Sequence, residues 1–158
     1  MTVSAPMQAR LDRLEEHLKE HDLRVEKRNG IVPVLCNRSS NSTRPLPTGG
    51  ATGTGFSWIA FFWPFAVLTQ IREFSYFGFV AVLSIITAWI HILTGVDMSV
   101  GVDIGICIMY AYWFPYLRYI AIQEDREEIS VPISIILGLL LIVAASIPAT
   151  VLETLFIN

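Results

Sequence analysis

Three long apolar stretches dominate the pattern of hydrophobic and polar positions along the chain. They run over residues 74–95, 104–122 and 131–157 and hold almost no charge. A hydrocarbon core about 30 Å thick needs roughly 20 consecutive apolar residues per helix, and each run approaches or exceeds that length. The pattern therefore predicts an all-α integral membrane protein with spans at about 74–95, 104–122 and 131–155.

The first 29 residues have the period of a charged helix instead. Apolar residues recur there at spacings of three, four and seven, on one stripe made of Leu11, Leu14, Leu18 and Val25. Such a stripe is typical of a short coiled coil or docking helix. It fits equally a solvated helix held by ion pairs four residues apart, such as Glu15 with Lys19. Gly30 is expected to end this helix.

Residues 37–55, which make up most of the segment 30–55, are rich in Ser, Thr, Pro and Gly and contain almost nothing that could be buried. A segment of that composition does not offset its ordering entropy, so we expect a flexible linker. Its glycines do not form a phosphate-binding loop, because no Lys-Ser or Lys-Thr follows them.

Residues 56–72 form a short aromatic segment interrupted by Pro64, which is marginal as a span. An interfacial or re-entrant helix is expected here, with a fourth full span as the competing interpretation. Indole, phenol and guanidinium groups favour the headgroup region. The expected membrane-interface anchors are Trp58, Trp63, Arg72, Tyr116, Arg118 and Tyr119.

The charges between the spans predict the topology. The loop at 96–103 has two Asp and no base, whereas the loop at 123–130 contains Arg126 and follows Arg118. Short cytoplasmic loops carry the excess of Lys and Arg, so the second loop is expected to face the cytoplasm. Residues 1–55 hold eight of the eleven Lys and Arg against six acids, and three spans keep this amino-terminal arm cytoplasmic as well.

The aromatic segment Gly-Phe-Ser-Trp-Ile-Ala-Phe-Phe-Trp-Pro-Phe-Ala-Val-Leu-Thr-Gln-Ile-Arg, at 55–72, resembles the opening motif of a family of small bacterial inner-membrane proteins. That family is catalogued as domain of unknown function 2628. Residues 110–119 are similar to the aromatic and basic end of its second spanning helix, so the resemblance covers about 55–122. It implies a bacterial inner-membrane location and no known activity.

Few residues within the spans carry candidate chemistry. His91 could ligate a haem or pigment, although a bis-His haem within one chain is excluded because His17 and His21 lie in the arm. Glu153, near the end of the last span, is expected to be solvated or paired. The acidic cluster at 123–128 lacks the spaced oxygens and glycine of a calcium loop, so no metal is predicted. We find no catalytic set and expect a protein that is not an enzyme and needs no cofactor.

Helices in lipid pack through small residues, and two pairs have the four-residue spacing: Gly101 with Gly105, and Ala145 with Ala149. The composition agrees with a single membrane domain, since 53% of the residues are hydrophobic and the mean hydropathy is +0.55. The leading hypothesis is a non-enzymatic structural or accessory subunit that contacts lipids and other membrane proteins or further copies, and no nucleic acid. The rival is a small homo-oligomeric transporter or channel lined by Ser84, Thr87, His91 and Glu153.

Overall fold

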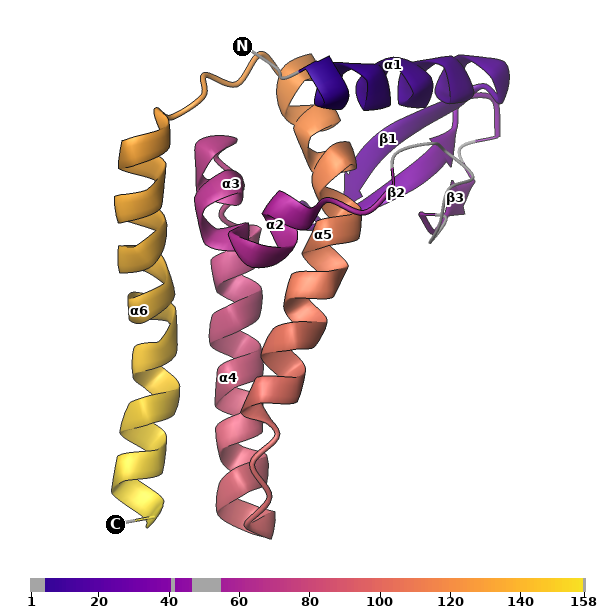
Figure 1. Cartoon of the computed structure of the whole chain (residues 1–158). Coiled ribbons are helices and arrows are strands. Elements are labelled where there is room, and N and C mark those ends of the chain that lie inside the picture. The colour runs from indigo at the N-terminus through magenta and orange to yellow at the C-terminus, as the bar shows by residue number, and fades with distance from the viewer. Residues whose placement is uncertain (1–4, 41, 47–54, 158) are drawn as a thin grey trace. The chain divides into compact units, whose positions relative to one another are not determined.

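The computed structural model describes residues 5–40, 42–46 and 55–157 (Figure 1). The chain divides into two compact units. The first unit contains the described residues up to Trp58 together with Tyr112–Glu127. The second contains Ile59–Ala111 and the described residues from Glu128 onward.

The amino-terminal part of the first unit combines one helix with a small sheet. Its elements in this part of the chain are α1 (Ala5–Glu20), β1 (Leu23–Arg28), β2 (Val32–Asn37) and β3 (Thr43–Arg44). The strands are antiparallel in the order β1-β2-β3, with Val25 opposite Leu35. Asn29 and Gly30 connect β1 to β2 with positive φ angles of 55° and 73°, the conformation that a tight hairpin turn requires.

This sheet corrects two expectations. The predicted charged helix over residues 1–29 ends at Glu20, and Asn29 and Gly30 end a strand rather than a helix. Leu23 and Val25 alternate with exposed Arg24 and Glu26, which is the period of two of a half-buried strand. The predicted linker at 30–55 contains β2 and β3, because the apolar run at 32–36 pairs with β1. Residues 41 and 47–54 of that linker lie outside the described residues.

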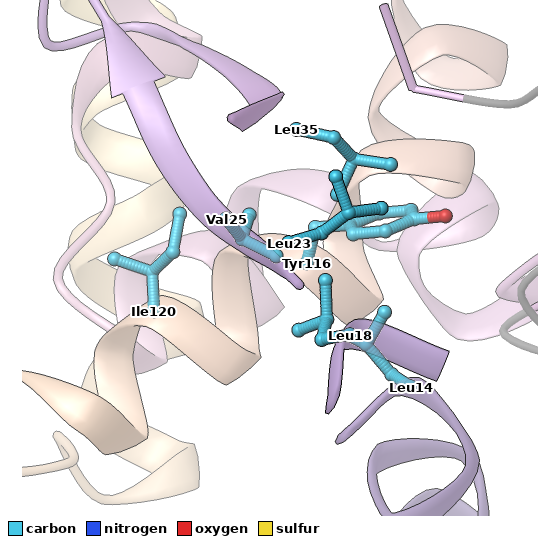
Figure 2. Packing of buried hydrophobic residues seen from close by; sticks show 7 residues of the cluster. All are labelled: Leu14, Leu18, Leu23, Val25, Leu35, Tyr116 and Ile120. Carbon is cyan, nitrogen blue, oxygen red and sulfur yellow. The ribbon is translucent and has the colours of Figure 1, made fainter. Parts of the chain in front are cut away.

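The core of the first unit joins α1, the hairpin and the second half of α5 (Ser99–Gln123). Figure 2 shows its buried side chains converging from these three sources: Leu14, Leu18, Leu23, Val25, Leu35, Tyr116 and Ile120. Tyr119 and Leu46 pack against this cluster and are partly buried. The leucine stripe of α1 is therefore used inside the chain, where Leu11 is buried as well.

The second unit is helical in the part that the structure describes. It contains α2 (Trp58–Phe62), α3 (Pro64–Gln70), α4 (Ser75–Thr94), the first half of α5, and α6 (Val131–Ile157). Both α3 and α4 pack against α6. Helices α4 and α6 run side by side in the same direction (Figure 1), since Gln70 lies near Ile129 and Trp89 near Phe156.

Among the described residues, three helices are long and apolar enough to cross a membrane: Ser75–Thr94, Ser99–Gln123 and Val131–Phe156. This agrees with the three predicted spans and indicates a membrane location. The second helix begins five residues earlier than predicted, because the Asp97 carboxylate accepts a hydrogen bond of 2.9 Å from the Ser99 backbone N–H and so caps the helix start. Hydrogen bonds from Ser99 also hold the pKa of Asp97 below its usual value.

The aromatic segment predicted as one helix at 56–72 is two short helices. The chain turns at Trp63, whose φ and ψ of -131° and 48° are not helical, and Pro64 begins α3. Proline is favoured at the first turn of a helix, where its missing N–H has no intrahelical partner. With five and seven residues, α2 and α3 are both too short to cross a membrane, so this part of the described chain forms no fourth full span.

Candidate functional site

A cavity among the helices of the second unit is the best candidate for a functional site. Its lining comes from the α2–α3 region and from α4, α5 and α6, and it is apolar on the side of Phe62, Phe65 and Val80. Five side chains with polar atoms also line it: Tyr76, Ser84, Asp103, Cys107 and Ser146. Ionisable residues at membrane depth are functional candidates by default, which draws attention to Asp103.

Asp103 lies in the second turn of α5 because that helix begins at Ser99. The charge pattern of the sequence predicted this residue in the loop at 96–103, so its carboxylate was not a candidate there. The signal that could have revealed it is the Asp-Met-Ser sequence at 97–99, a helix-capping pattern that starts the helix four residues before Asp103. A carboxylate in this position can accept hydrogen bonds or attract a cation or a proton inside the cavity.

A buried polar cluster supports one end of α4. Glu73 has only 3% of its surface exposed, and its carboxylate accepts a hydrogen bond of 2.6 Å from the Ser75 hydroxyl. The Ser75 and Tyr110 hydroxyls are 3.4 Å apart, and the rings of Tyr76 and Tyr110 meet edge to face at 5.1 Å. These contacts fix α4 against the first half of α5.

His91 and Glu153 form a pair between α4 and α6. The His91 Nδ1 and Glu153 Oε1 atoms are 3.3 Å apart, although 62 positions separate the two residues in the sequence. The imidazole predicted as a haem or pigment ligand thus has a carboxylate neighbour, which leaves Nε2 as its other nitrogen. The expectation that Glu153 is solvated or paired agrees with this geometry, because both side chains remain partly exposed.

Small residues on α6 allow close packing. Gly138 lies so near α3 that a Cβ atom there would be 2.6 Å from the Phe65 carbonyl oxygen. Ala145 is buried on the same helix and Ala149 is partly buried, and the packing role of this pair stays a prediction. Gly101 and Gly105 differ, because both are exposed on α5, and a Cβ built there has no described atom within 4 Å beyond its own stretch of helix.

The predicted membrane-interface anchors fall into two groups. Trp58, Trp63 and Arg72 are exposed, with 66% and 53% of the two indole residues' surfaces accessible. Tyr116 and Arg118 are buried within the first unit, and Tyr119 is partly buried there. The interface role of all six residues stays a prediction.

No family model, curated protein or solved structure matches the chain. The fold and the apolar helices therefore define the class by themselves, a predominantly helical protein with three helices suited to crossing a membrane. The resemblance of residues 55–122 to domain of unknown function 2628 stays a prediction.

Proposed function

We propose that this protein is a non-enzymatic accessory subunit of the bacterial inner membrane, with its amino terminus in the cytoplasm. Its spans pack against another membrane protein or a further copy of the chain. The part of the first unit that precedes the spans, with α1 and the hairpin, is then cytoplasmic. The bacterial location rests on the family resemblance, and the orientation rests on the excess of Lys and Arg in the amino-terminal arm.

The open glycine face of α5 is the observation that carries this proposal. The chain covers the small residues Gly138 and Ala145 with its own helices, but leaves Gly101 and Gly105 uncovered within the described residues. Glycines at a four-residue spacing let two membrane helices approach closely, so a helix from outside the chain can pack here. A helix face that contacts only lipid does not need small residues at this spacing.

The test is replacement of both glycines with leucine, followed by purification in mild detergent and mass spectrometry of the complex. We expect Gly101→Leu/Gly105→Leu to lose the associated protein or the homo-oligomer. Gly78→Leu is the matched control, because Gly78 is an equally open glycine on α4. Retention of the complex by the double variant, or its loss in the control alone, contradicts the proposed surface.

A small homo-oligomeric transporter or channel is the second candidate. The cavity lined by Ser84, Asp103 and Ser146 favours it, since a carboxylate beside hydroxyl groups suits the passage of a proton or a cation. Proteoliposomes with an entrapped pH dye or K⁺ dye test this function. Asp103→Asn is expected to abolish the flux, while Asp97→Asn, outside the spans, retains it. Equal fluxes in wild type and Asp103→Asn contradict the transporter hypothesis.

A further inference from the structure

A cluster of three metal-ligating side chains lies at the end of α1 in the first unit. His17, Glu20 and His21 each offer a ligand atom, and these atoms all lie within 4.8 Å of one another. The two imidazole rings are in contact, with their centroids 4.4 Å apart. From the sequence, both histidines were expected only as members of the charged amino-terminal arm.

The helical geometry explains why these residues meet. At about 100° per residue, positions 17, 20 and 21 fall within a sector of about 100° on the helix surface. Glu20 is the last residue of α1, and the His21 backbone N–H still donates a hydrogen bond of 3.2 Å to the His17 carbonyl. That bond closes one more turn, so the imidazole of His21 follows that of His17 on the same face.

The chemistry of this donor set matches a divalent transition metal. Two imidazoles and one carboxylate bind Zn²⁺ in many proteins, with metal–nitrogen bonds of about 2.0–2.1 Å. In tetrahedral geometry, ligand atoms at that bond length lie about 3.3 Å apart. Side-chain rotation can bring atoms that start within 4.8 Å to that separation. His17 is half-buried, whereas Glu20 and His21 are exposed, so water can complete the coordination.

The local charges also favour a cation. The carboxyl end of a helix carries a partial negative charge that attracts cations. Lys19 points to another face, where its ammonium pairs with Glu15 at 2.7 Å. Arg13 precedes His17 by one turn, and its Nε donates to the Ala9 carbonyl at 3.2 Å, towards the start of the helix.

We propose that His17, Glu20 and His21 bind a divalent transition-metal ion, with Zn²⁺ as the fitting probe. The bound ion joins the last turn of α1 to the connection that leads into β1 at Leu23. It therefore stabilises the fold of the first unit at the point where the helix gives way to the hairpin. This proposal is independent of the proposed membrane function.

The experiment is calorimetric titration of the full chain with Zn²⁺ in detergent, using a purification tag that contains no histidine. Both cysteines are replaced with alanine so that thiolates do not compete. We expect His17→Ala and His21→Ala each to weaken Zn²⁺ binding at least tenfold, about 1.4 kcal/mol. His91→Ala is the matched control, because it removes the third histidine of the chain and is expected to leave the affinity unchanged.

A second measurement separates metal binding from loss of folding. Zn²⁺ should raise the unfolding temperature of the first unit in wild type, as any ligand of the native state does, but not in His21→Ala. His21 is exposed, so circular dichroism of this variant should match wild type without metal. Equal Zn²⁺ affinity in wild type, His17→Ala and His21→Ala, or no binding by wild type, overturns the proposal. So does a loss of binding caused by His91→Ala alone.

Discussion

Gly138 of α6 meets the backbone of Phe65 in α3 so closely that a Cβ atom would lie 2.6 Å from the Phe65 carbonyl oxygen. The same carbonyl accepts a hydrogen bond of 2.6 Å from the Thr69 hydroxyl, within α3. The two nearest atoms are the carbonyl oxygen and carbon of the Phe65 backbone, which cannot rotate away as a flexible side chain could. The absence of a side chain at 138 therefore sets how closely α3 and α6 approach.

Gly138→Ala is expected to separate α3 from α6 and to destabilise the second unit. Overpacking of a tight contact costs about 1–3 kcal/mol, more than the helix propensity gained by removing a glycine, about 1 kcal/mol. Thermal unfolding in detergent measures the loss. Gly78→Ala is the control, since it gains the same propensity in α4 without any neighbour within 4 Å. Equal unfolding temperatures for the two variants would contradict the close contact.

Leu14→Ala is expected to destabilise the first unit. Leu14 is fully buried among α1, the hairpin and α5, and removal of a buried leucine side chain costs about 2–5 kcal/mol. Limited proteolysis of α1 and the hairpin reports this change directly. Ile31→Ala, at the exposed hairpin turn, is the control and should cleave like wild type. If Leu14→Ala instead keeps its protease resistance and only dissociates a complex, the stripe serves association rather than the internal core.

The His91–Glu153 pair should appear as a small coupling energy. Both side chains are partly exposed, at 32% and 43%, and such pairs contribute about 0.2–1 kcal/mol. Unfolding free energies of His91→Ala, Glu153→Ala and the double variant form a thermodynamic cycle that isolates the interaction. Strictly additive effects would mean that the two side chains do not interact in the membrane-embedded protein.

The stability of the first unit is expected to fall at alkaline pH through Cys36. Burial raises the pKa of the Cys36 thiol in β2, and a hydrogen bond with Glu26 raises it further. The exposed thiol of the unfolded chain ionises at its ordinary pKa, about 8.5, so the unfolded state gains as the pH rises past that value. The stabilising contribution of the protonated Cys36 thiol is complete below the pKa of the unfolded chain. It is lost as the pH rises towards the raised pKa of the thiol in the folded protein.

The measurement is hydrogen exchange of the hairpin amides in wild type and Cys36→Ala between neutral and alkaline pH, corrected for intrinsic exchange. The variant lacks the thiol, so the difference between the two proteins removes the contributions of lysine and tyrosine. Wild type should lose more stability than the variant as the pH rises. The same burial predicts slow alkylation of Cys36 in the folded protein. Parallel curves for the two proteins would contradict the raised pKa.

Local composition was enough to predict the membrane helices. The hydrophobic runs predict α4 and α6 within a few residues of their observed bounds. The reason is that backbone N–H and C=O groups in lipid must form hydrogen bonds within the segment, which for a single run of this length requires a helix. The start of α5 was missed because the average polarity of its first turn predicts a loop. The hydrogen bond that Asp97 accepts from the Ser99 N–H instead favours a helix start there. Pro64 indicated the break in the aromatic segment correctly. It did not indicate that the segment forms two separate helices, the second of which begins at Pro64.

The hairpin shows where sequence periodicity becomes ambiguous. Val25 lies seven positions after Leu18, as in a helix, and two after Leu23, as in a strand. Pairing with Leu35 settles the choice, and that pairing depends on the core supplied by Tyr116 and Ile120 of α5, about 90 residues further along the chain. Propensity alone does not contain this information, because tertiary packing overrides it.

The sequence by itself determined which segments are apolar enough for a membrane and where most of them begin and end, since those properties depend on neighbouring residues. Only the tertiary structure decided which polar groups meet: His91 with Glu153, Ser75 with Tyr110, and the side chains that line the cavity beside Asp103. Most of these contacts join helices that lie far apart in the sequence. They depend on the direction and separation of packed helices, which small residues such as Gly138 set and which no local pattern specifies.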